Sequence, residues 1–168
     1  LAATMRMIAN HGQSKRYHHD IVGCNSRLDN LQAGILRIKL RELDSYIDSR
    51  RKAAAYYDSF FSQIEGIKVP VRSADSRHVF HQYTLTLEGI DRNGLHEFLA
   101  GKEIPSMIYY PIPAHRQKMF ASFGSENSDL PITDWLTERV ISLPIHTELE
   151  EDQLKHITAS VLEFVKKK

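Results

Sequence analysis

Apolar residues recur at intervals of three and four over a long part of the chain, from Leu28 to Ile64. This spacing places one apolar stripe along an α-helix, and no proline interrupts it before Pro70. The pattern predicts a helix over Leu28–Glu65, bent near Ser45–Ser49, where good helix formers become fewer. A helix of about 35 residues spans roughly 50 Å, so we expect it to bridge two bodies or to pack against a partner chain.

The segment before this helix has a different pattern. Leu1–Asn10 carries apolar residues on one face and predicts a shorter helix that stops at Gly12. Gln13–Asp20 is rich in charge and histidine. Gly23 then precedes the long helix, where we expect its tolerance of unusual backbone angles to be used. Three residues can cap that helix with a side-chain acceptor: Asn25, Ser26 and Asp29.

Shorter patterns of strand and helix alternate after Gly66. Strands are predicted over Ile67–Val71, Val79–Leu87, Ile104–Tyr110 and Ser142–His146. Helices are predicted from Asp91 to Gly101, after a Thr133 cap, and after a capping box of Thr147 and Glu150. This order predicts an α+β domain of roughly 100 residues with an open sheet of three or four strands. Six side chains of the last two helices are expected to be buried: Leu136, Val140, Leu154, Ile157, Val161 and Phe164.

Composition narrows the class of protein. A chain of 168 residues with 42% apolar content suits one domain, or one domain plus part of another. The 22 basic and 21 acidic residues balance, which argues against a nucleic-acid partner or an acidic membrane surface. The single Cys24 fits a reducing compartment, and no apolar run approaches the length of a membrane span, so we expect a cytoplasmic protein. Because the chain opens with Leu1 inside a helix pattern, we also expect a piece of a longer protein.

Several sites with known sequence signatures are absent. No glycine-rich phosphate loop and no Gly-x-Ser-x-Gly nucleophile motif occurs. Nine histidines are present, but His18 and His19 are adjacent, and the spacing of His78 and His81 places them on opposite faces of a strand. No cysteine or carboxylate stands at ligand spacing from them, so we predict no metal site.

Two segments carry side chains suited to binding, and each has a structural alternative. Gln13–His19 is basic and aromatic and can hold a phosphate or stack on a base, although a solvated loop is the usual explanation of such a composition. Ile108–His115 brings two phenols from a strand into a stiff proline segment that an imidazole follows. Loops after strands commonly carry sites, but a half-buried tyrosine pair has the same pattern.

Five groups of residues occur in order along nearly the whole chain. They are Asn10-His11-Gly12; Gly23-x-Asn25-x-Arg27-Leu28-Asp29-x-Leu31-Gln32-Ala33; His81-Gln82-Tyr83; Pro105-Ser106-x-x-x-Tyr110-Pro111-x-Pro113-x-His115; and Ser142-Leu143-Pro144-Ile145-His146 with Leu149 and Gln153-Leu154. In this combination the chain resembles the C-terminal half of the DegT-like sugar aminotransferases. These are pyridoxal 5'-phosphate (PLP) enzymes that act on nucleotide-linked keto-sugars, and the likeness is strongest to members that make amino sugars for surface polysaccharides.

The resemblance implies a fold and an organisation. The chain would be the C-terminal small domain of the PLP-dependent aspartate-aminotransferase (type I) fold, preceded by a long bridging helix. Residues 1–27 would be the tail end of the large PLP-binding domain, 28–66 the bridging helix and 67–168 the C-terminal α+β domain. The family forms homodimers, and we expect the first half of the long helix to carry the association.

The resemblance also implies site residues. Asn25 is similar to the family asparagine that reaches the PLP phosphate of the partner subunit, and Arg27 would meet an anionic part of the substrate. Tyr110 and His115 resemble substrate-side residues. No catalytic residue is assigned, because the family's Schiff-base lysine and the acidic partner of the pyridine nitrogen would precede Leu1. We therefore expect this chain alone to be inactive and not to bind PLP.

Three residues depart from the family pattern: Gly34, Ala114 and Arg116, which stand where alanine, leucine and an apolar residue are commoner. The last two bear on which sugar is bound. The leading hypothesis is a sugar aminotransferase, which uses an amino-acid donor, and the alternative is a non-catalytic binding or dimerisation module. A Ser-x-x-x-x-x-Lys-like segment encoded upstream of Leu1 would favour the enzyme. A third hypothesis, a nucleic-acid binder that uses Lys15 and Arg16, predicts salt-dependent binding of oligonucleotides.

Overall fold

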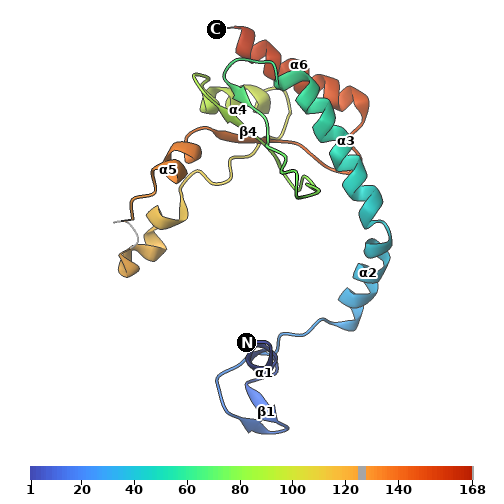
Figure 1. Cartoon of the computed structure of the whole chain (residues 1–168), viewed down its shortest axis with the longest axis vertical. Coiled ribbons are helices and arrows are strands. Elements are labelled where there is room, and N and C mark those ends of the chain that lie inside the picture. The colour runs from blue at the N-terminus through green and yellow to red at the C-terminus, as the bar shows by residue number, and fades with distance from the viewer. Residues whose placement is uncertain (125–127, 168) are drawn as a thin grey trace. The chain divides into compact units, whose positions relative to one another are not determined.

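The structure is a computed structural model, and it describes residues 1–124 and 128–167 (Figure 1). It is α+β, as the sequence predicts. The Cα positions divide the chain into two compact units, Leu1–Leu43 and Asp44–Lys168.

The first unit contains a helix, a small hairpin and a second helix. The predicted N-terminal helix is confirmed as α1, Ala2–Ala9. Strands β1 (Gln13–Lys15) and β2 (His18–His19) pair antiparallel, so the basic and aromatic segment forms an exposed hairpin. Helix α2 spans Asn30–Arg41 and has Asp29 at its N-cap, where the backbone N–H donates to Oε1 of Gln32 at 3.3 Å. Of the three capping candidates, Asp29 therefore caps α2.

The long predicted helix is two helices in the structure. Helix α2 ends at Arg41, and α3 covers Leu43–Phe61. The interruption is at Glu42, whose N–H donates to the carbonyl of Lys39 and so tightens the last turn of α2. The predicted bend near Ser45–Ser49 is wrong, because these residues lie inside the regular part of α3. Local helix propensity is a weak guide here, since α3 is held by buried side chains further along.

The second unit is built on a sheet of three strands, within the predicted three or four, and its pairing is antiparallel. The strands are β3 (Ile67–Lys68), β4 (Tyr83–Leu87) and β5 (Val140–Leu143), and β4 is in the centre. Alternate residues of β4 are fully buried, which gives one apolar face. The extended segment predicted from Ser142 onward is thus confirmed over its first two residues as part of β5.

Three predicted strands are shorter than their patterns or absent, and the first of them, Ile67–Val71, forms a strand only over Ile67–Lys68. Val79–Gln82 is irregular before β4, because Phe80 has φ 51° and Nη1 of Arg50 binds the carbonyls of Phe80 and His81. Ile104–Tyr110 forms only an isolated bridge, between Met107 and Ser142, among the described residues. The ring of Pro105 removes a backbone donor from that segment, which disfavours a continuous ladder.

The helix caps of the second unit are partly those expected. Helix α4 (Arg92–Ala100) begins after Asp91, whose Oδ1 accepts two backbone N–H groups, and ends at Gly101, as predicted. Helix α5 (Pro131–Thr137) begins at its proline and not after Thr133, because proline suits the first turn, where no N–H is needed. Up to residue 124, two short 3-10 helices precede it, η1 (Ala114–Arg116) and η2 (Lys118–Phe123).

The last helix, α6 (Glu151–Lys166), also begins later than predicted. Its capping box consists of Glu150 and Gln153, with a 3.0 Å hydrogen bond from the Glu150 N–H to Oε1 of Gln153. The predicted box of Thr147 and Glu150 is wrong by one turn. A glutamine three residues after the cap supplies the same reciprocal pairing.

One apolar core joins helices α3, α4 and α6 to the sheet (Figure 1). Its largest fully buried side chains come from α3 and the sheet region: Tyr57, Phe61, Phe80, Tyr83 and Leu85. Of the six side chains expected to be buried, three are: Leu154, Ile157 and Val161. Val140 and Phe164 are half-buried, and Leu136 is exposed on α5.

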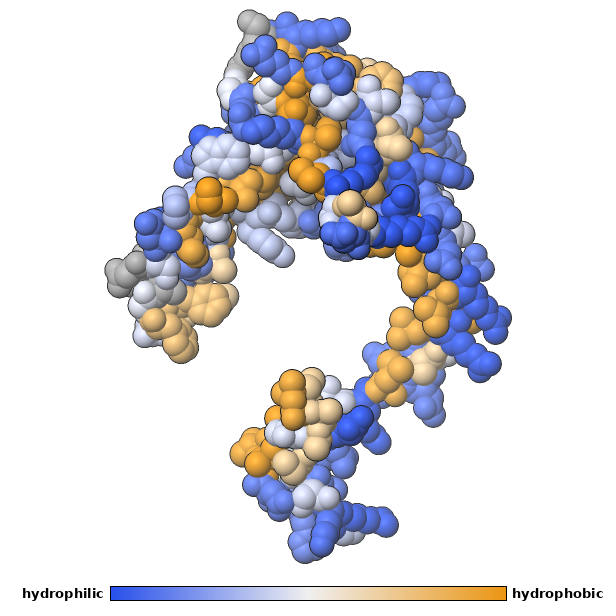
Figure 2. All heavy atoms as spheres, in the orientation of Figure 1, coloured by the Kyte–Doolittle hydropathy of each residue, from blue (hydrophilic) through white to orange (hydrophobic). Residues whose placement is uncertain are grey.

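Helix α2 differs from these helices, because none of its side chains is buried within the described residues. Figure 2 shows apolar side chains at the surface along this helix. Its exposed apolar residues follow the predicted stripe: Leu31, Ile35, Leu36, Ile38 and Leu40. The stripe is therefore an unpaired surface of the first unit as described.

A charged cluster between α4 and α6 gives a pH prediction. Nζ of Lys102 and Nζ of Lys167 donate to Glu163 at 2.5 and 2.7 Å, and these bonds lower the pKa of Glu163 from 4.5 to about 2. A lowered folded pKa stabilises the fold above the unfolded value, and this contribution is lost as the pH falls through the folded value. We expect Glu163→Gln to lower the melting temperature near neutral pH, with the difference from wild type closing between about pH 4.5 and about pH 2.

Thermal unfolding followed by circular dichroism across this pH range measures the effect. Glu151→Gln is the control, because that carboxylate pairs only with exposed Lys155 in the described structure. A difference between Glu163→Gln and wild type that stays constant down to pH 2 would contradict the prediction.

Candidate functional site

The segment that carries Asn25 and Arg27 is held against the end of α1 by backbone hydrogen bonds. The Cys24 N–H donates to the carbonyl of Ile8 at 2.8 Å, and the Ser26 N–H donates to that of Ala9 at 2.9 Å. In return, the His11 N–H donates to the carbonyl of Cys24 at 2.9 Å. This pairing fixes the backbone on both sides of Asn25.

Two glycines make this close approach possible. Gly12 has φ +73°, and a Cβ there would lie 1.7 Å from the carbonyl oxygen of Ile21. Gly23 does not have a positive φ, so the predicted reason for this glycine is wrong. A Cβ at Gly23 would lie 2.1 Å from the backbone nitrogen of Gly12 and 2.6 Å from the carbonyl oxygen of Ile8. Glycine is required at position 23 because the two backbones lie so close together that any side chain would separate them.

Asn25 and Arg27, both predicted site residues, are brought together. Nε of Arg27 donates to Oδ1 of Asn25 at 3.0 Å, and both side chains are exposed. This bond uses the carbonyl oxygen of the amide and leaves its NH2 group as a donor. An amide donor next to a guanidinium suits an anionic ligand such as a phosphate or a carboxylate.

Tyr110 and His115 belong to the second unit, where Tyr110 lines a hollow of about 270 Å³. Tyr109, Tyr110, Pro113 and Ala114 form one wall of the hollow, and the other wall is formed by Thr133, Leu136, Thr137 and Val140. Tyr110 is 71% exposed, so the alternative of a half-buried tyrosine pair does not describe it. His115 is buried in η1 next to this wall.

The chemistry beside this hollow centres on Asp134 of α5. Nε and Nη2 of Arg116 donate to its two carboxylate oxygens at 2.8 and 2.5 Å. These bonds are the main reason that the pKa of Asp134 lies below its usual range, and the nearby His115 lowers it further. Nε2 of His115 lies 3.3 Å from Oδ1 of Asp134. Sequence reasoning missed Asp134, because nothing in its local pattern distinguishes it from a surface aspartate.

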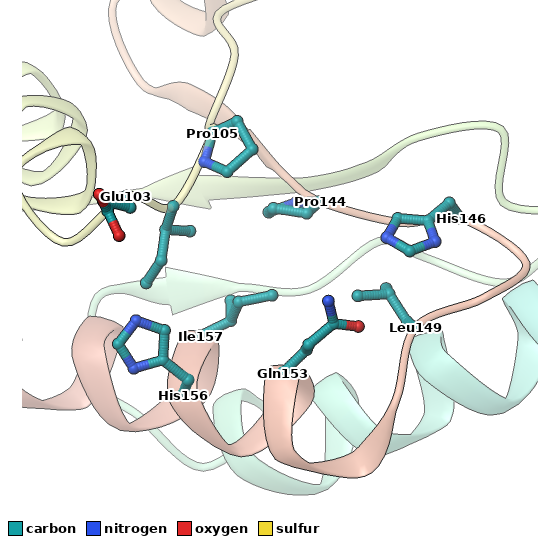
Figure 3. Close-up of a pocket in the computed structure, with 9 residues that line it drawn as sticks. Glu103, Pro105, Pro144, His146, Leu149, Gln153, His156 and Ile157 are labelled. Atoms are coloured by element: carbon teal, nitrogen blue, oxygen red, sulfur yellow. The ribbon is translucent and has the colours of Figure 1, made fainter.

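A second hollow of about 270 Å³ lies between the segment after α4 and the start of α6 (Figure 3). Figure 3 shows the imidazoles of His146 and His156 at opposite ends of it, with Gln153 between them. Nδ1 of His146 accepts the Glu148 N–H at 3.2 Å, and Gln153 caps α6. The motif residues around Pro144 and His146 thus shape the turn from β5 into α6, which is a structural role.

Of the predicted site residues, the structure joins Asn25 and Arg27 in the first unit by a hydrogen bond, whereas in the second unit Tyr110 lines the hollow and His115 is buried beside its wall. No three histidine, cysteine or acidic side chains of residues 1–124 and 128–167 are grouped to hold a metal ion. Across the same residues, no helix has the length and apolar character needed to span a membrane.

Comparison with known proteins places the chain in a family. Residues 1–162 match the DegT/DnrJ/EryC1/StrS aminotransferase family, and the chain belongs to it. The resemblance seen in the sequence motifs is thereby confirmed. Members of this family use PLP.

Two curated relatives illustrate the family. The chain is 41% identical over 161 residues to UDP-N-acetyl-3-dehydro-alpha-D-glucosamine 3-aminotransferase of Acidithiobacillus ferrooxidans, covering 96% of this chain and 42% of the relative. It is 39% identical to UDP-2-acetamido-2-deoxy-3-oxo-D-glucuronate aminotransferase of Pseudomonas aeruginosa, covering 96% of this chain and 43% of the relative. The chain therefore spans less than half the length of the curated relatives that it matches.

A solved structure supports the same fold. The crystal structure of S. venezuelae DesV in complex with a ketimine intermediate superposes with a TM-score of 0.88 and 34% identity. The match covers 98% of this chain and 44% of the DesV chain. An aminotransferase of this family from Brucella abortus gives a TM-score of 0.83 at 31% identity, over 97% of this chain and 43% of that one.

Proposed function

We propose that this chain is the C-terminal part of a PLP-dependent aminotransferase that moves an amino group from an amino acid to a nucleotide-linked keto-sugar, for amino sugars of surface polysaccharides. The observation that carries the proposal is the family match over residues 1–162, together with relatives whose names describe aminotransferases of nucleotide-linked sugars. In this proposal, residues 1–27 are the end of the large PLP-binding domain and residues 28–66 are the bridging helix. Residues 67–168 form the small domain of the type I fold. The protein works as a cytoplasmic homodimer, which the exposed apolar stripe of α2 supports.

The residues around Asn25 fit the phosphate end of PLP. The Asn25 NH2 group is a free donor for a phosphate oxygen, since its carbonyl oxygen is held by Arg27. The guanidinium of Arg27 orients the amide and contributes positive charge next to it. When bound, PLP supplies the electron sink and carries the amino group during transfer. In this proposal Asn25 binds the cofactor of the partner subunit, and Arg27 binds an anionic part of the substrate.

Tyr110 and His115 serve the substrate in this proposal. The Tyr110 hydroxyl can donate to or accept from a sugar hydroxyl at the mouth of its hollow. The imidazole of His115, buried behind that wall, can hold or accept a proton at a ring nitrogen.

The chain alone is inactive in this proposal, because it does not bind PLP. Asn25 offers the cofactor one or two hydrogen bonds worth roughly 0.5–1.5 kcal/mol each. Millimolar affinity requires about 4 kcal/mol.

Asn25→Ala in the complete protein tests the cofactor role. We expect the substitution to weaken PLP binding by about tenfold, because it removes a charge-assisted hydrogen bond of about 1.5 kcal/mol. Titration of the apoenzyme with PLP, followed by absorbance, measures the affinity. Ser26→Ala is the matched control, because in the described structure Ser26 contacts its neighbours through its backbone N–H.

Two results would contradict the proposal. An Asn25→Ala protein that binds PLP as tightly as the Ser26→Ala protein would remove the assigned role of Asn25. A complete wild-type protein that transfers no amino group to any nucleotide-linked keto-sugar would remove the proposed activity. The 168-residue chain serves as the blank, since we expect it to show no PLP absorbance of its own.

A further inference from the structure

Asp134 joins two residues of the 3-10 helix η1 to helix α5. Its carboxylate accepts two hydrogen bonds from Arg116, at 2.8 and 2.5 Å, and its Oδ1 lies 3.3 Å from Nε2 of His115. The same oxygen, Oδ1, therefore faces both Nε of Arg116 and the imidazole. The three residues lie next to the hollow of Tyr110, since Ala114 and Thr133, their chain neighbours, line it.

The environment of His115 makes this contact more than a surface ion pair. The ring is buried, and its Nε2 atom has no aligned hydrogen-bond partner within the described residues. A buried polar atom without a hydrogen-bond partner destabilises the fold, so the ring gains by turning Nε2 toward an acceptor within reach. That acceptor is Oδ1 of Asp134. A neutral imidazole that points Nε2 at a carboxylate keeps its proton on that nitrogen, which leaves Nδ1 as the acceptor atom.

Arg116 explains why Asp134 is a suitable partner. Its two hydrogen bonds fix the carboxylate on α5 in one orientation and keep it ionised. Arg116 is itself one of the departures from the family pattern, where an apolar residue is commoner. A surface ion pair of this kind contributes little to stability. Its effect here is therefore on the orientation and charge of Asp134.

We propose that Asp134 is a positioning residue that orients the buried imidazole of His115 beside the Tyr110 hollow and fixes its proton on Nε2. The link from this ring to the substrate rests on the proposed function. A carboxylate that fixes the tautomer of a histidine sets which ring nitrogen can take part in proton transfer. Asp134 then acts through His115 and does not touch the substrate.

The tautomer of His115 tests the assignment directly. The 168-residue chain is labelled with 15N-histidine, and the two-bond 1H–15N correlations of the ring are recorded with a His115→Gln sample for assignment. We expect the Nε2–H tautomer in wild type and in Arg116→Gln, because both retain the carboxylate. In Asp134→Asn the amide can donate to Nε2, so we expect the Nδ1–H form to appear. The amide spectrum of each variant shows whether its fold is intact. Asp134→Glu retains a carboxylate, so we expect it to show the Nε2–H tautomer of wild type.

The complete protein tests the consequence for the reaction. We expect Asp134→Asn to lower kcat about tenfold or more while the KM of the amino donor stays within about twofold. Asp134→Glu should recover part of the loss. An unchanged Nε2–H pattern in Asp134→Asn overturns the positioning of the ring, and a changed tautomer with unchanged kcat overturns its importance. If the wild-type protein is not an aminotransferase, the activity assay shows this separately, and the tautomer comparison still decides whether Asp134 holds His115.

Discussion

Gly23→Ala is expected to dismantle the segment that carries Asn25 and Arg27. An alanine Cβ would lie 2.1 Å from the backbone nitrogen of Gly12 and 2.6 Å from the carbonyl oxygen of Ile8. Neither atom belongs to a flexible side chain, so the two backbones must separate, at a cost of about 3 kcal/mol or more. The separation breaks the hydrogen bonds that Cys24 and Ser26 donate to the end of α1.

Amide hydrogen exchange measures this effect. We expect the protection of the Cys24 and Ser26 N–H groups to fall by roughly 100-fold, while the amides of the second unit keep theirs. Gly34→Ala is the control, since a Cβ at that position on α2 would meet no described atom within 4 Å apart from its chain neighbours and the backbone of its own helix. That change should stabilise α2 by about 0.5–1 kcal/mol, because alanine is the better helix former. Equal protection in Gly23→Ala and wild type would show that the two backbones are not packed as described.

Tyr57→Ala is expected to lower the free energy of unfolding of the second unit by about 3–5 kcal/mol. Tyr57 is fully buried on α3, and its ring lies 4.9 Å from that of Tyr83 and 6.0 Å from that of Phe61. Its hydroxyl donates to the carbonyl oxygen of Pro144 at 2.8 Å. Alanine therefore leaves a cavity between helix and sheet and an unpaired carbonyl.

Urea unfolding followed by circular dichroism measures this loss. Tyr57→Phe separates its two causes, because it keeps the ring and removes only the hydroxyl. We expect that variant to lose about 1–3 kcal/mol, the cost of a buried carbonyl left without its donor. If Tyr57→Ala lost no more than Tyr57→Phe, the ring would not be part of the core.

Local chemistry determined the parts of the fold that the sequence predicted well. Asp91 and Gly101 bound α4 as expected, because a capping side chain and a helix-ending glycine act within one turn. The residue pattern of Val79–Leu87 likewise predicted the strand that the structure forms as β4. The irregular run before β4 was not predictable from its own residues, since it depends on the three carbonyls that Arg50 binds, those of Phe80, His81 and Ile145. The last of these is 95 residues from Arg50.

The candidate site also has one part that depends on neighbouring residues and one part that depends on residues far apart in the sequence. Asn25 and Arg27 are two residues apart, and their hydrogen bond follows from a short motif that sequence analysis could recognise. Asp134 is 18 residues from Arg116 and meets it only because α5 packs beside η1. No periodicity or spacing along the chain encodes that meeting, so the partner of His115 emerged only from the folded structure.

The exposed stripe of α2 has a consequence for how this part of the chain acquires its structure. The helix has 12 residues, and none of its side chains is buried within the described residues. Isolated helices of this length are marginal in water, since nucleation is costly and few hydrogen bonds repay it. The capping box at Asp29 and Gln32 offsets only part of that cost. In the proposed homodimer, helix formation in α2 would be coupled to the docking of another apolar surface, so that folding of the segment and assembly would become one thermodynamic event.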